Sequence, residues 1–466
     1  MKVDSTGGIG VTADPQKVRP GMIYVDLSDK RNKRQLYEAY INGAALIFTP
    51  YNISDPELPV IKVRSTRDTL YMLIERYFAK HGNRAKLVGI LGDGSKTVLV
   101  EMIQNILLGK GSSGSAGIRS RGSLGSPHGI DEFFDSFSDM YMQGMDIIPI
   151  SIDMDPGSIF YFSGMNIDCA VMTGTGYPEN SRGGSSLMDY LSGLSEKKTV
   201  IINNDEHYGL KTKDAIGGKG FIAYGLNKKA SVTASSIDID ESTCFNYCVQ
   251  RSFLTRSGVK VEPFEIPVRL KTLGTYNIYN ALAAITCGLY YDIDIMRIKA
   301  AVEGYKAPAR HFQKIYDGEF TVIDNYCSSM KDYAAAFDSL QVLSYDDLIL
   351  IISVAQSQAD AFHEEKARLI TEWAGLLKCK EVILTSCMDG SNRIGELPIK
   401  SIRIYKRVFR ESGLTFRYYH LLQHSIERGL SVIKKRGLLV LLGSEEMNIA
   451  HKLLQRQLRP ATDRKN

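Results

Sequence analysis

The chain has 466 residues, 44% of them apolar and 23% charged, which is enough for about three globular domains with buried cores. Its 57 basic and 52 acidic side chains give a formal charge of +5, which is too small and too mixed to indicate a nucleic-acid partner. No window approaches about 18 uninterrupted apolar residues, and residues 1–10 lack the pattern of a signal peptide, so we expect a cytoplasmic protein without a membrane partner.

The first part of the chain, residues 1–84, has the pattern of a small α/β module. Short apolar runs bounded by turn residues predict strands, and apolar residues at helical spacing predict helices. The predicted strands are 22–27, 44–48 and 60–63, and the predicted helices are 35–42 and 65–81. We expect these elements to form one N-terminal domain.

A glycine-rich turn follows the apolar run 87–91 and leads into an amphipathic helix predicted over 96–108. Its sequence is Gly89-Ile90-Leu91-Gly92-Asp93-Gly94-Ser95-Lys96-Thr97. Backbone N–H groups of such a turn and of the helix N-terminus can face a phosphate, Lys96 adds a positive charge, and Thr97 is a candidate magnesium ligand. The glycine spacing departs from the strict P-loop pattern, so an ordinary strand-to-helix turn is the alternative.

The rest of the central region, which we place at 85–307, alternates strand and helix patterns. Strands are predicted at 146–152, 167–172 and 199–202, and helices at 130–142, 275–289 and 294–303. Residues 109–129 form a predicted loop, and the period-two segments 218–235 and 241–270 predict antiparallel strands appended to the sheet. The alternation indicates a mostly parallel sheet with the phosphate turn at its carboxyl edge.

The same alternation returns in residues 308–466. Strands are predicted at 320–324, 347–353, 380–385, 401–406 and 437–442. Helices are predicted between and after them, at 331–341, 364–378, 420–428 and 445–456. The fold class is therefore α/β with three domains: a small N-terminal module, a central P-loop-type sheet and a C-terminal doubly wound sheet.

Several stretches, taken together and in order, resemble the Mur ligase superfamily of ATP-dependent amide ligases, most closely its UDP-N-acetylmuramoyl-tripeptide synthetase branch. The most specific is Gly274-Thr275-Tyr276-Asn277-Ile278-Tyr279-Asn280-Ala281-Leu282-Ala283-Ala284. The others are the glycine spacing of 89–97, the start at 11–25, Ser126-Pro127 and the segment 203–206. The resemblance implies a substrate-binding-like N-terminal domain and an ATP-binding central domain, which close with the C-terminal domain around ATP, an acceptor and an amino acid.

The resemblance also implies roles for individual residues. Lys96 and Arg310 are the catalytic candidates, and the implied nucleotide contacts are Gly92, Asp93, Gly94, Ser95, Lys96, Thr97, Asn277, Asn280, Arg310 and Asp324. In that family pattern Thr97 holds a metal, the two asparagines lie near the base, Arg310 contacts the terminal phosphate and Asp324 contacts the ribose. From the residues alone, Asn277 and Asn280 equally suit buried hydrogen bonds, Arg310 an ordinary ion pair, and Asp324 a helix cap.

Other family positions have changed in this sequence. The metal-binding glutamate falls at about Ser151, where Asp153 is a candidate replacement or a residue of a solvated turn. Glu179 stands near a metal-binding histidine and could hold a hard cation. The lysine that the family carbamylates falls on Gly193-Leu194.

The positions that hold the usual substrates have changed as well. Pro15-Gln16 replaces a serine and an arginine that contact the nucleotide-sugar. The Asp-Asn-Pro-Arg motif that reads the incoming amino acid falls on Cys387-Met388-Asp389-Gly390. A histidine at the end of a C-terminal strand becomes Cys327.

The retained nucleotide set predicts a divergent Mur-type ATP-dependent amide (peptide) ligase that uses ATP and Mg²⁺. It would join an unknown carboxylate acceptor to an amine through an acyl phosphate, and would not use standard UDP-muramoyl peptides. The changed metal positions support a second hypothesis, an ATP-binding pseudoenzyme or interaction protein. A different phosphotransferase built on the same loop is the third, because fold does not fix function.

Overall fold

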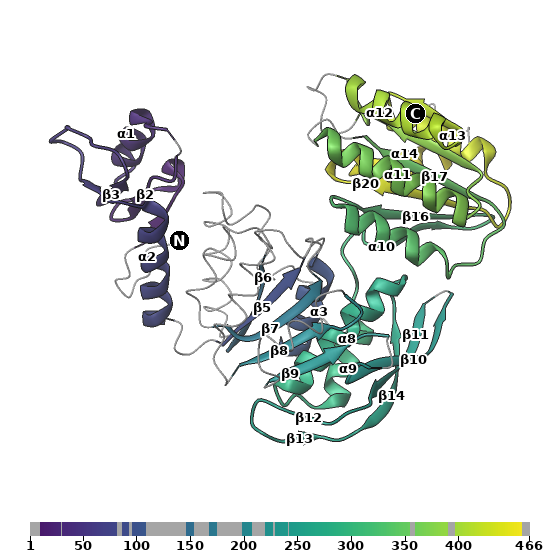
Figure 1. The fold of residues 1–466 in the computed structure, drawn as a ribbon, viewed down its shortest axis with the longest axis horizontal. Helices are drawn as coiled ribbons and strands as arrows, with labels where there is room; N and C mark the ends of the chain where they lie inside the picture. Colours follow the sequence, from purple (N-terminus) through teal and green to yellow (C-terminus); the bar gives the residue numbers. More distant parts are fainter. Residues whose placement is uncertain are drawn as a thin grey trace. The chain divides into compact units, whose positions relative to one another are not determined.

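A computed structural model describes most of the chain (Figure 1). The described residues are 10–28, 30–81, 86–92, 96–108, 146–152, 167–174, 198–206, 220–226, 229–240, 242–354, 359–389 and 397–458. They fall into two compact units, one drawn from Met1–Thr233, Tyr247–Glu265 and Ala281–Val302 and the other from Ala234–Asn246, Ile266–Asn280 and Glu303–Asn466. The predicted loop 109–129 and the predicted helix 130–142 lie outside the described residues.

The N-terminal elements form a four-stranded, wholly parallel sheet in the order β1-β2-β3-β4. The elements are β1 (Val11–Thr12), η1 (Pro15–Lys17), β2 (Ile23–Val25), α1 (Lys33–Ile41), β3 (Leu46–Thr49), β4 (Val60–Lys62) and α2 (Thr66–His81). Tyr24, Ile47, Leu36 and Ala39 pack together in its core. The strands and helices predicted for this region are confirmed, with ends shifted by at most two residues.

An eight-stranded sheet follows, in the order β14-β11-β10-β9-β8-β7-β5-β6. Its strands are β5 (Lys86–Gly92), β6 (Ile147–Ile152), β7 (Ile167–Gly174), β8 (Thr199–Asn203), β9 (Phe221–Tyr224), β10 (Val232–Ile239), β11 (Thr243–Val249) and β14 (Phe264–Leu270). The helices described in this region are α3 (Thr97–Leu108), α8 (Thr275–Tyr290) and α9 (Ile295–Gly304). Strands β6, β5, β7, β8, β9 and β10 pair in parallel, which confirms the predicted mostly parallel sheet.

The prediction of antiparallel strands over 218–235 and 241–270 is wrong in part. β9 pairs with both β8 and β10 in parallel, and Val232 lies opposite Tyr224. The antiparallel pair β12 (Phe253–Leu254) and β13 (Lys260–Val261) forms a separate two-stranded sheet. The error has a physical cause, because period-two spacing reports which face of a strand is buried and carries no information on strand direction.

The C-terminal sheet has six strands in the order β15-β16-β20-β17-β18-β19. Its elements are β15 (Gln313–Asp317), β16 (Thr321–Tyr326), α10 (Met330–Leu340), β17 (Leu348–Ser353), α11 (Asp360–Leu376), β18 (Glu381–Thr385), α12 (Ile399–Glu411), β19 (Phe416–Tyr419), α13 (Leu422–Val432), β20 (Leu438–Gly443), η2 (Glu445–Met447) and α14 (Ala450–Leu458). Only β15 is antiparallel to its neighbour among these paired strands. Leu439 and Leu441 pack with α13 and α14, and the intervening Val440 is equally buried, so both faces of the sheet are covered.

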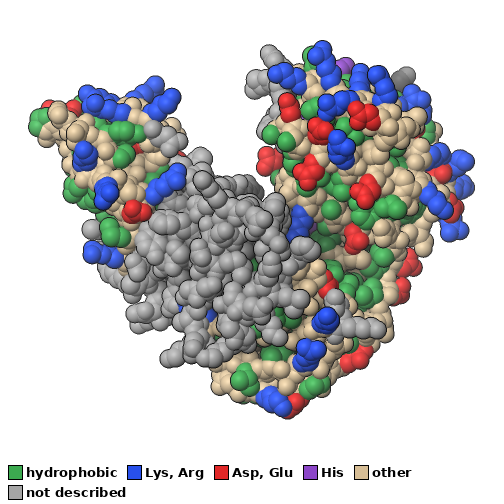
Figure 2. All heavy atoms as spheres, viewed as in Figure 1, with side chains coloured by type: hydrophobic (Ala, Val, Ile, Leu, Met, Phe, Trp, Pro, Cys, Tyr) green, Lys and Arg blue, Asp and Glu red, His purple; other side chains and the backbone are tan. Residues whose placement is uncertain are grey.

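The predicted strand 401–406 is wrong, because the segment lies inside α12. The buried residues of α12 include Ile402, Tyr405, Val408 and Phe409, at helical spacing. Ile402 and Ile404 alternate with polar residues, so a window of six residues here also fits a strand, whereas the full length of α12 fits only a helix. On the face shown in Figure 2, the described surface carries both signs of charge interspersed, as the balanced composition leads one to expect.

Candidate functional site

The phosphate turn follows the carboxyl end of β5, which lies between β7 and the edge strand β6 of the eight-stranded sheet. β5 is buried over Leu87–Gly92, and α3 begins at Thr97. Lys96 has a relative exposure of 7%, and its Nζ donates a hydrogen bond of 2.7 Å to the Gly92 carbonyl oxygen. The ammonium group therefore lies against the turn whose N–H groups would face an anion. Asp93, Gly94 and Ser95 lie outside the described residues.

Gly92 is required where it stands because β7 approaches it closely. A Cβ built on Gly92 would lie 1.9 Å from Thr173 Oγ1 and 3.0 Å from the Gly174 carbonyl oxygen. Thr173 Oγ1 donates to the Leu91 carbonyl oxygen at 3.3 Å, which fixes the threonine beside the turn. The glycine thus allows β5 and β7 to stay paired up to the point where the turn begins.

Replacing Gly92 with alanine is expected to lower the free energy of unfolding by about 1–3 kcal/mol, the cost of overpacking a closed site. Gly304→Ala is the matched control, because a Cβ there meets nothing within 4 Å. Thermal unfolding of the two variants beside the wild type measures the difference. Equal stability of all three proteins would show that β7 yields without cost.

Two polar residues near the same sheet edge serve the fold. Asn203, at the end of β8, donates to the Thr173 carbonyl oxygen at 3.4 Å and accepts from the Asp205 N–H at 3.1 Å. The Asp205 carboxylate accepts from the Leu226 N–H at 2.7 Å. These bonds tie the ends of β7, β8 and β9 together.

The metal positions of the sequence prediction are mostly outside the described part of the chain. Asp153, Glu179 and residues 193–194 are not described, whereas Thr97 is the first residue of α3 and Ser151 lies in β6 opposite Ile90. Within the described ranges, no cluster of three or more His, Cys, Asp or Glu side chains could hold a metal ion. Among the described residues, the Thr97 hydroxyl is the candidate oxygen ligand for a magnesium ion, and the phosphate oxygens of a bound nucleotide would supply further ligands.

Asn277 and Asn280 lie near the start of α8. Asn277 is fully buried, and its Nδ2 donates to the Leu273 carbonyl oxygen at 2.6 Å. Asn280 Nδ2 donates to Asn277 Oδ1 at 3.4 Å. The structure thus shows buried hydrogen bonding for Asn277, and a contact of either asparagine with a nucleotide base stays a prediction.

The start of α8 is held against α10 within the same compact unit. Thr275 Oγ1 donates to Asp338 Oδ2 at 2.8 Å, and the Tyr276 ring meets the Phe312 ring edge-on at 6.2 Å. A Cβ on Gly274 would lie 3.0 Å from Ser339 Oγ. The signature at 274–284 therefore has a packing role that the motif alone does not reveal.

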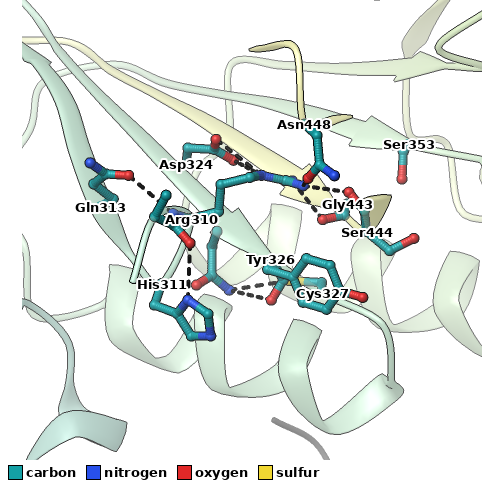
Figure 3. Close-up of polar contacts among 12 residues, drawn as sticks. Arg310, His311, Gln313, Asp324, Tyr326, Cys327, Ser353, Gly443, Ser444 and Asn448 are labelled. Atoms are coloured by element: carbon teal, nitrogen blue, oxygen red, sulfur yellow. Dashed lines mark hydrogen bonds and ion pairs between the residues drawn. The ribbon is translucent and has the colours of Figure 1, made fainter. Parts of the chain in front are cut away.

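Arg310 and Asp324 form a buried ion pair at the carboxyl edge of the six-stranded sheet (Figure 3). Arg310 Nε lies 3.1 Å from both carboxylate oxygens of Asp324. Nη1 donates to the Ser444 carbonyl oxygen and, at 2.8 Å, to Asn448 Oδ1, and Nη2 donates to the Gly443 carbonyl oxygen at 2.7 Å. Four of the five guanidinium N–H groups are thus engaged by β16 and by the turn after β20.

The backbone around Arg310 is held in an unusual conformation. Arg310 has φ +64 and Phe312 has φ +54, a region that costs a non-glycine residue about 1–3 kcal/mol. The Arg310 N–H donates to Gln313 Oε1 at 3.0 Å, and the Phe312 N–H donates to Asn325 Oδ1 at 2.8 Å. These bonds aim the arginine side chain along the end of β16.

Asp324 is the counter-ion of Arg310. Its side chain is 1% exposed, and burial raises its pKa although the Arg310 charge and hydrogen bonds oppose that rise. The ion pair considered for Arg310 is thus confirmed. The helix cap considered for Asp324 is wrong, because Ser329 caps α10. A ribose contact of Asp324 stays a prediction.

Residues 387–389 align with the motif that binds the incoming amino acid in the Mur ligase pattern, but here Cys387 and Asp389 have structural roles. Cys387 is fully buried, and the Asp389 carboxylate accepts from the N–H groups of Leu422 and Gln423 at 2.7 and 2.8 Å. Asp389 thus caps the start of α13. Gly390 lies outside the described residues.

Sequence reasoning missed three polar residues at the same sheet edge: Ser353, Lys366 and Glu446. Their exposures are 1%, 0% and 4%. Lys366 stands on the same helical face as the buried His363 and Ile370 of α11, so it occupies a core position. That spacing was the one available signal, because a lysine in a helix is ordinarily a solvated residue.

Comparison with known proteins supports the resemblance read from the sequence. The Mur ligase middle domain model matches residues 187–288. The UDP-N-acetylmuramoyl-L-alanyl-D-glutamate–2,6-diaminopimelate ligase of Caldanaerobacter subterraneus subsp. tengcongensis is 22% identical over 451 residues, covering 93% of this chain and 89% of that protein. The chain therefore resembles the Mur ligase superfamily over most of its length. Its relatives are Mur ligases, and the resemblance read from the sequence is confirmed.

Solved structures of similar fold cover most of the chain. MurF from Acinetobacter baumannii has a TM-score of 0.69 at 16% identity, covering 96% of this chain and 92% of its own. MurF ligase from Thermotoga maritima, solved in complex with ADP, has a TM-score of 0.68 at 16% identity, covering 97% and 98%. No helix among the described residues is both long and apolar enough to cross a membrane.

Proposed function

We propose that this Mur ligase homologue is a divergent ATP-dependent amide (peptide) ligase that acts on acceptors other than standard UDP-muramoyl peptides. The observation that carries the proposal is Lys96, whose ammonium group lies on the β5–α3 turn at the carboxyl edge of a parallel sheet. A curated relative named as a ligase covers 93% of the chain, which supports the same reaction class.

The proposed roles follow the geometry of each group. The first N–H groups of α3 and Lys96 would bind the phosphates of ATP, and Thr97 would hold Mg²⁺. Asn277 and Asn280 would lie near the base, Arg310 would contact the terminal phosphate, and Asp324 the ribose. The domains are proposed at 1–84, 85–307 and 308–466, the first for the acceptor and the second for ATP.

The proposed chemistry has two displacement steps. An oxygen of the acceptor carboxylate attacks the terminal phosphorus of ATP, the bond to the bridging oxygen breaks, and ADP leaves. The nitrogen of the incoming amine then attacks the carbonyl carbon of the acyl phosphate, loses a proton and expels phosphate as the amide bond forms. Positive groups placed on the transferring phosphate, such as Lys96 and Arg310, lower the barrier of the first step.

A second candidate function is nucleotide binding without ligation. Ser151 favours it, because this uncharged residue of β6 stands where the family has a metal-binding glutamate. Gly193 and Leu194, which also lack a charge for a second metal, favour it too. Fewer metal ligands would cost several kcal/mol of transition-state stabilisation without removing affinity for ATP.

Lys96→Ala is expected to weaken Mg-ATP binding by about 1.5–3 kcal/mol, because a charge-assisted contact to phosphate is lost. Lys86→Ala is the matched control: this lysine begins the same strand, at its opposite end. Titration calorimetry on the full chain measures both affinities. Equal affinity in wild type and Lys96→Ala, or no binding in either, would remove the phosphate-binding role of the turn and with it the proposed function.

A further inference from the structure

A lysine is fully buried in the C-terminal unit, close to the turn that binds Arg310. Lys366, on α11, has 0% exposure. Its Nζ donates to the Tyr333 hydroxyl at 2.7 Å and to the Ser353 carbonyl oxygen at 2.8 Å, and it lies 4.2 Å from the centroid of the Tyr333 ring. An ammonium group is costly to bury, so its position calls for a compensating negative charge.

Glu446 supplies that charge. It lies in η2 with a relative exposure of 4%. Its carboxylate accepts hydrogen bonds from the Ser353 hydroxyl and from the N–H and hydroxyl of Ser444. The Glu446 carboxylate raises the pKa of Lys366, against the lowering by burial. Ser353 stands between them, since its carbonyl oxygen accepts from Lys366 while its hydroxyl donates to Glu446.

The same turn binds Arg310. Gly443 and Ser444 present their carbonyl oxygens to the guanidinium group, and Asn448 presents its side-chain oxygen (Figure 3). Glu446 lies between Ser444 and Asn448 in the chain, so its attachment to β17 through Ser353 fixes the turn from the other side. A continuous set of hydrogen bonds therefore runs from α11 through the ends of β17 and β20 to Arg310.

We propose that Lys366, acting through Ser353 and Glu446, is a positioning residue that holds the Gly443–Asn448 turn in the arrangement that directs the Arg310 guanidinium. The proposal rests on the proposed function, in which Arg310 contacts the terminal phosphate of ATP. Lys366 itself touches no nucleotide. Its charge keeps the Glu446 carboxylate against β17, and without it the carboxylate is a buried anion held by hydroxyl and amide donors alone.

Titration of Lys366 offers an independent readout. Burial lowers the pKa of Lys366 to about 8, although Glu446 raises it. The other groups that face it keep their charge states near pH 8, because the pKa of Glu446 is lowered and the pKa values of Cys327, Cys387 and Tyr333 are raised by burial. The ammonium charge is thus present below pH 8 and is lost as the pH rises through that value.

The test compares ATP with ADP, because only ATP carries the phosphate that Arg310 would contact. Titration calorimetry on the full chain gives both affinities for wild type, Lys366→Met, Arg310→Lys and Arg368→Met. Arg368 is the matched control, since it is an exposed cation of the same helix whose partner is Glu364. Partial unfolding would weaken the binding of ATP and of ADP equally. The ratio of the two affinities therefore separates a loss of Arg310 positioning from a loss of stability.

Lys366→Met is expected to lower the affinity for ATP about tenfold and that for ADP by less than about twofold, in the same direction as Arg310→Lys. Arg368→Met should match wild type. The ATP preference of wild type should fall between pH 7 and 9, and Lys366→Met should show no such fall. If Lys366→Met does not fold, Ser353→Ala, which keeps the lysine, should lower the ATP preference about threefold.

The outcomes separate the two proposals. A lowered ATP preference in Arg310→Lys, with wild-type preference in Lys366→Met and Ser353→Ala, overturns the positioning role and leaves the proposed function intact. An unchanged preference in Arg310→Lys removes the phosphate role of Arg310, and the positioning proposal falls with it. Absence of ATP binding in wild type overturns the proposed function itself.

Discussion

Replacing Asp324 with alanine is expected to lower the free energy of unfolding by about 3–5 kcal/mol, the usual cost of leaving one charge of a buried ion pair without its partner. The guanidinium group of Arg310 would stay enclosed by the carbonyl oxygens of Gly443 and Ser444, which cannot neutralise it. The positive φ of Arg310 adds strain that the intact bonds now offset. Few single replacements in this unit should cost more.

The measurement has a reporter in the right place. Trp373 is the only tryptophan of the chain, and it lies on α11, stacked on Phe337 with a ring-centroid distance of 5.9 Å. Its fluorescence during denaturant unfolding therefore reports the C-terminal unit. The comparison is between wild type and Asp324→Ala at neutral pH.

Two further variants make this prediction specific. The double replacement Arg310→Met, Asp324→Ala removes both charges and is expected to cost less than Asp324→Ala alone. Lys435→Ala, which breaks an exposed pair with Glu319, is expected to change the stability by less than about 1 kcal/mol. If Asp324→Ala proves as stable as the double variant or more stable, then Arg310 finds another partner or water when Asp324 is absent.

Periodicity was sufficient for most of the fold. The run 87–91 and the helix over 96–108 agree with β5 and α3 to within one residue, because a wholly buried strand followed by glycines and an amphipathic helix is a strong local pattern. The strand order could not be predicted from the sequence. β20 is the last described strand in the chain, and yet it lies between β16 and β17 in the sheet. The apolar run 438–442 indicates a strand buried on both faces, but it does not say which strands are its neighbours.

The site was partly predictable, and for a different reason. Arg310 and Asp324 were found through motif positions, but their pairing depends on β16 bringing a strand end beside a left-handed backbone turn. Lys366 and Glu446 were missed because their separation in the chain hides their proximity. A sequence pattern places charged side chains such as Lys366 and Glu446 in solvent. They are buried because α11 and the turn after β20 meet at the end of β17, and this depends on the order of the strands in the sheet.

Standard UDP-muramoyl peptides are expected to give no acceptor-dependent turnover, even when ATP binds. The nucleotide-sugar position shows why most directly. Pro15 has no N–H to donate, its carbonyl oxygen accepts from Asn42 Nδ2 at 2.9 Å, and the Gln16 N–H donates to Asp14 Oδ1 at 3.0 Å. The backbone groups there serve η1, and Gln16 stands at the position where the family has an arginine.

The metal and amino-acid positions point the same way. Ser151 brings no negative charge to β6, and Leu194 cannot be carbamylated. At the amino-acid position the Asp389 carboxylate caps α13, so it repels a carboxylate where an arginine fork would bind one. Simultaneous compensation at all three places is improbable, because each replacement group must lie within about 0.5 Å of productive geometry.

The assay is phosphate release by the full chain with ATP, magnesium and a panel of UDP-muramoyl acceptors and amino acids. Lys96→Ala supplies the background rate, because it removes the proposed phosphate contact. Release above that background with a UDP-muramoyl acceptor contradicts the prediction and assigns the chain to cell-wall precursor synthesis. Release only with other carboxylate–amine pairs supports the divergent ligase. If no pair gives phosphate release while calorimetry shows bound ATP, the nucleotide-binding protein is favoured, because the chain would then retain the contacts that bind ATP and lack those needed to transfer its terminal phosphate.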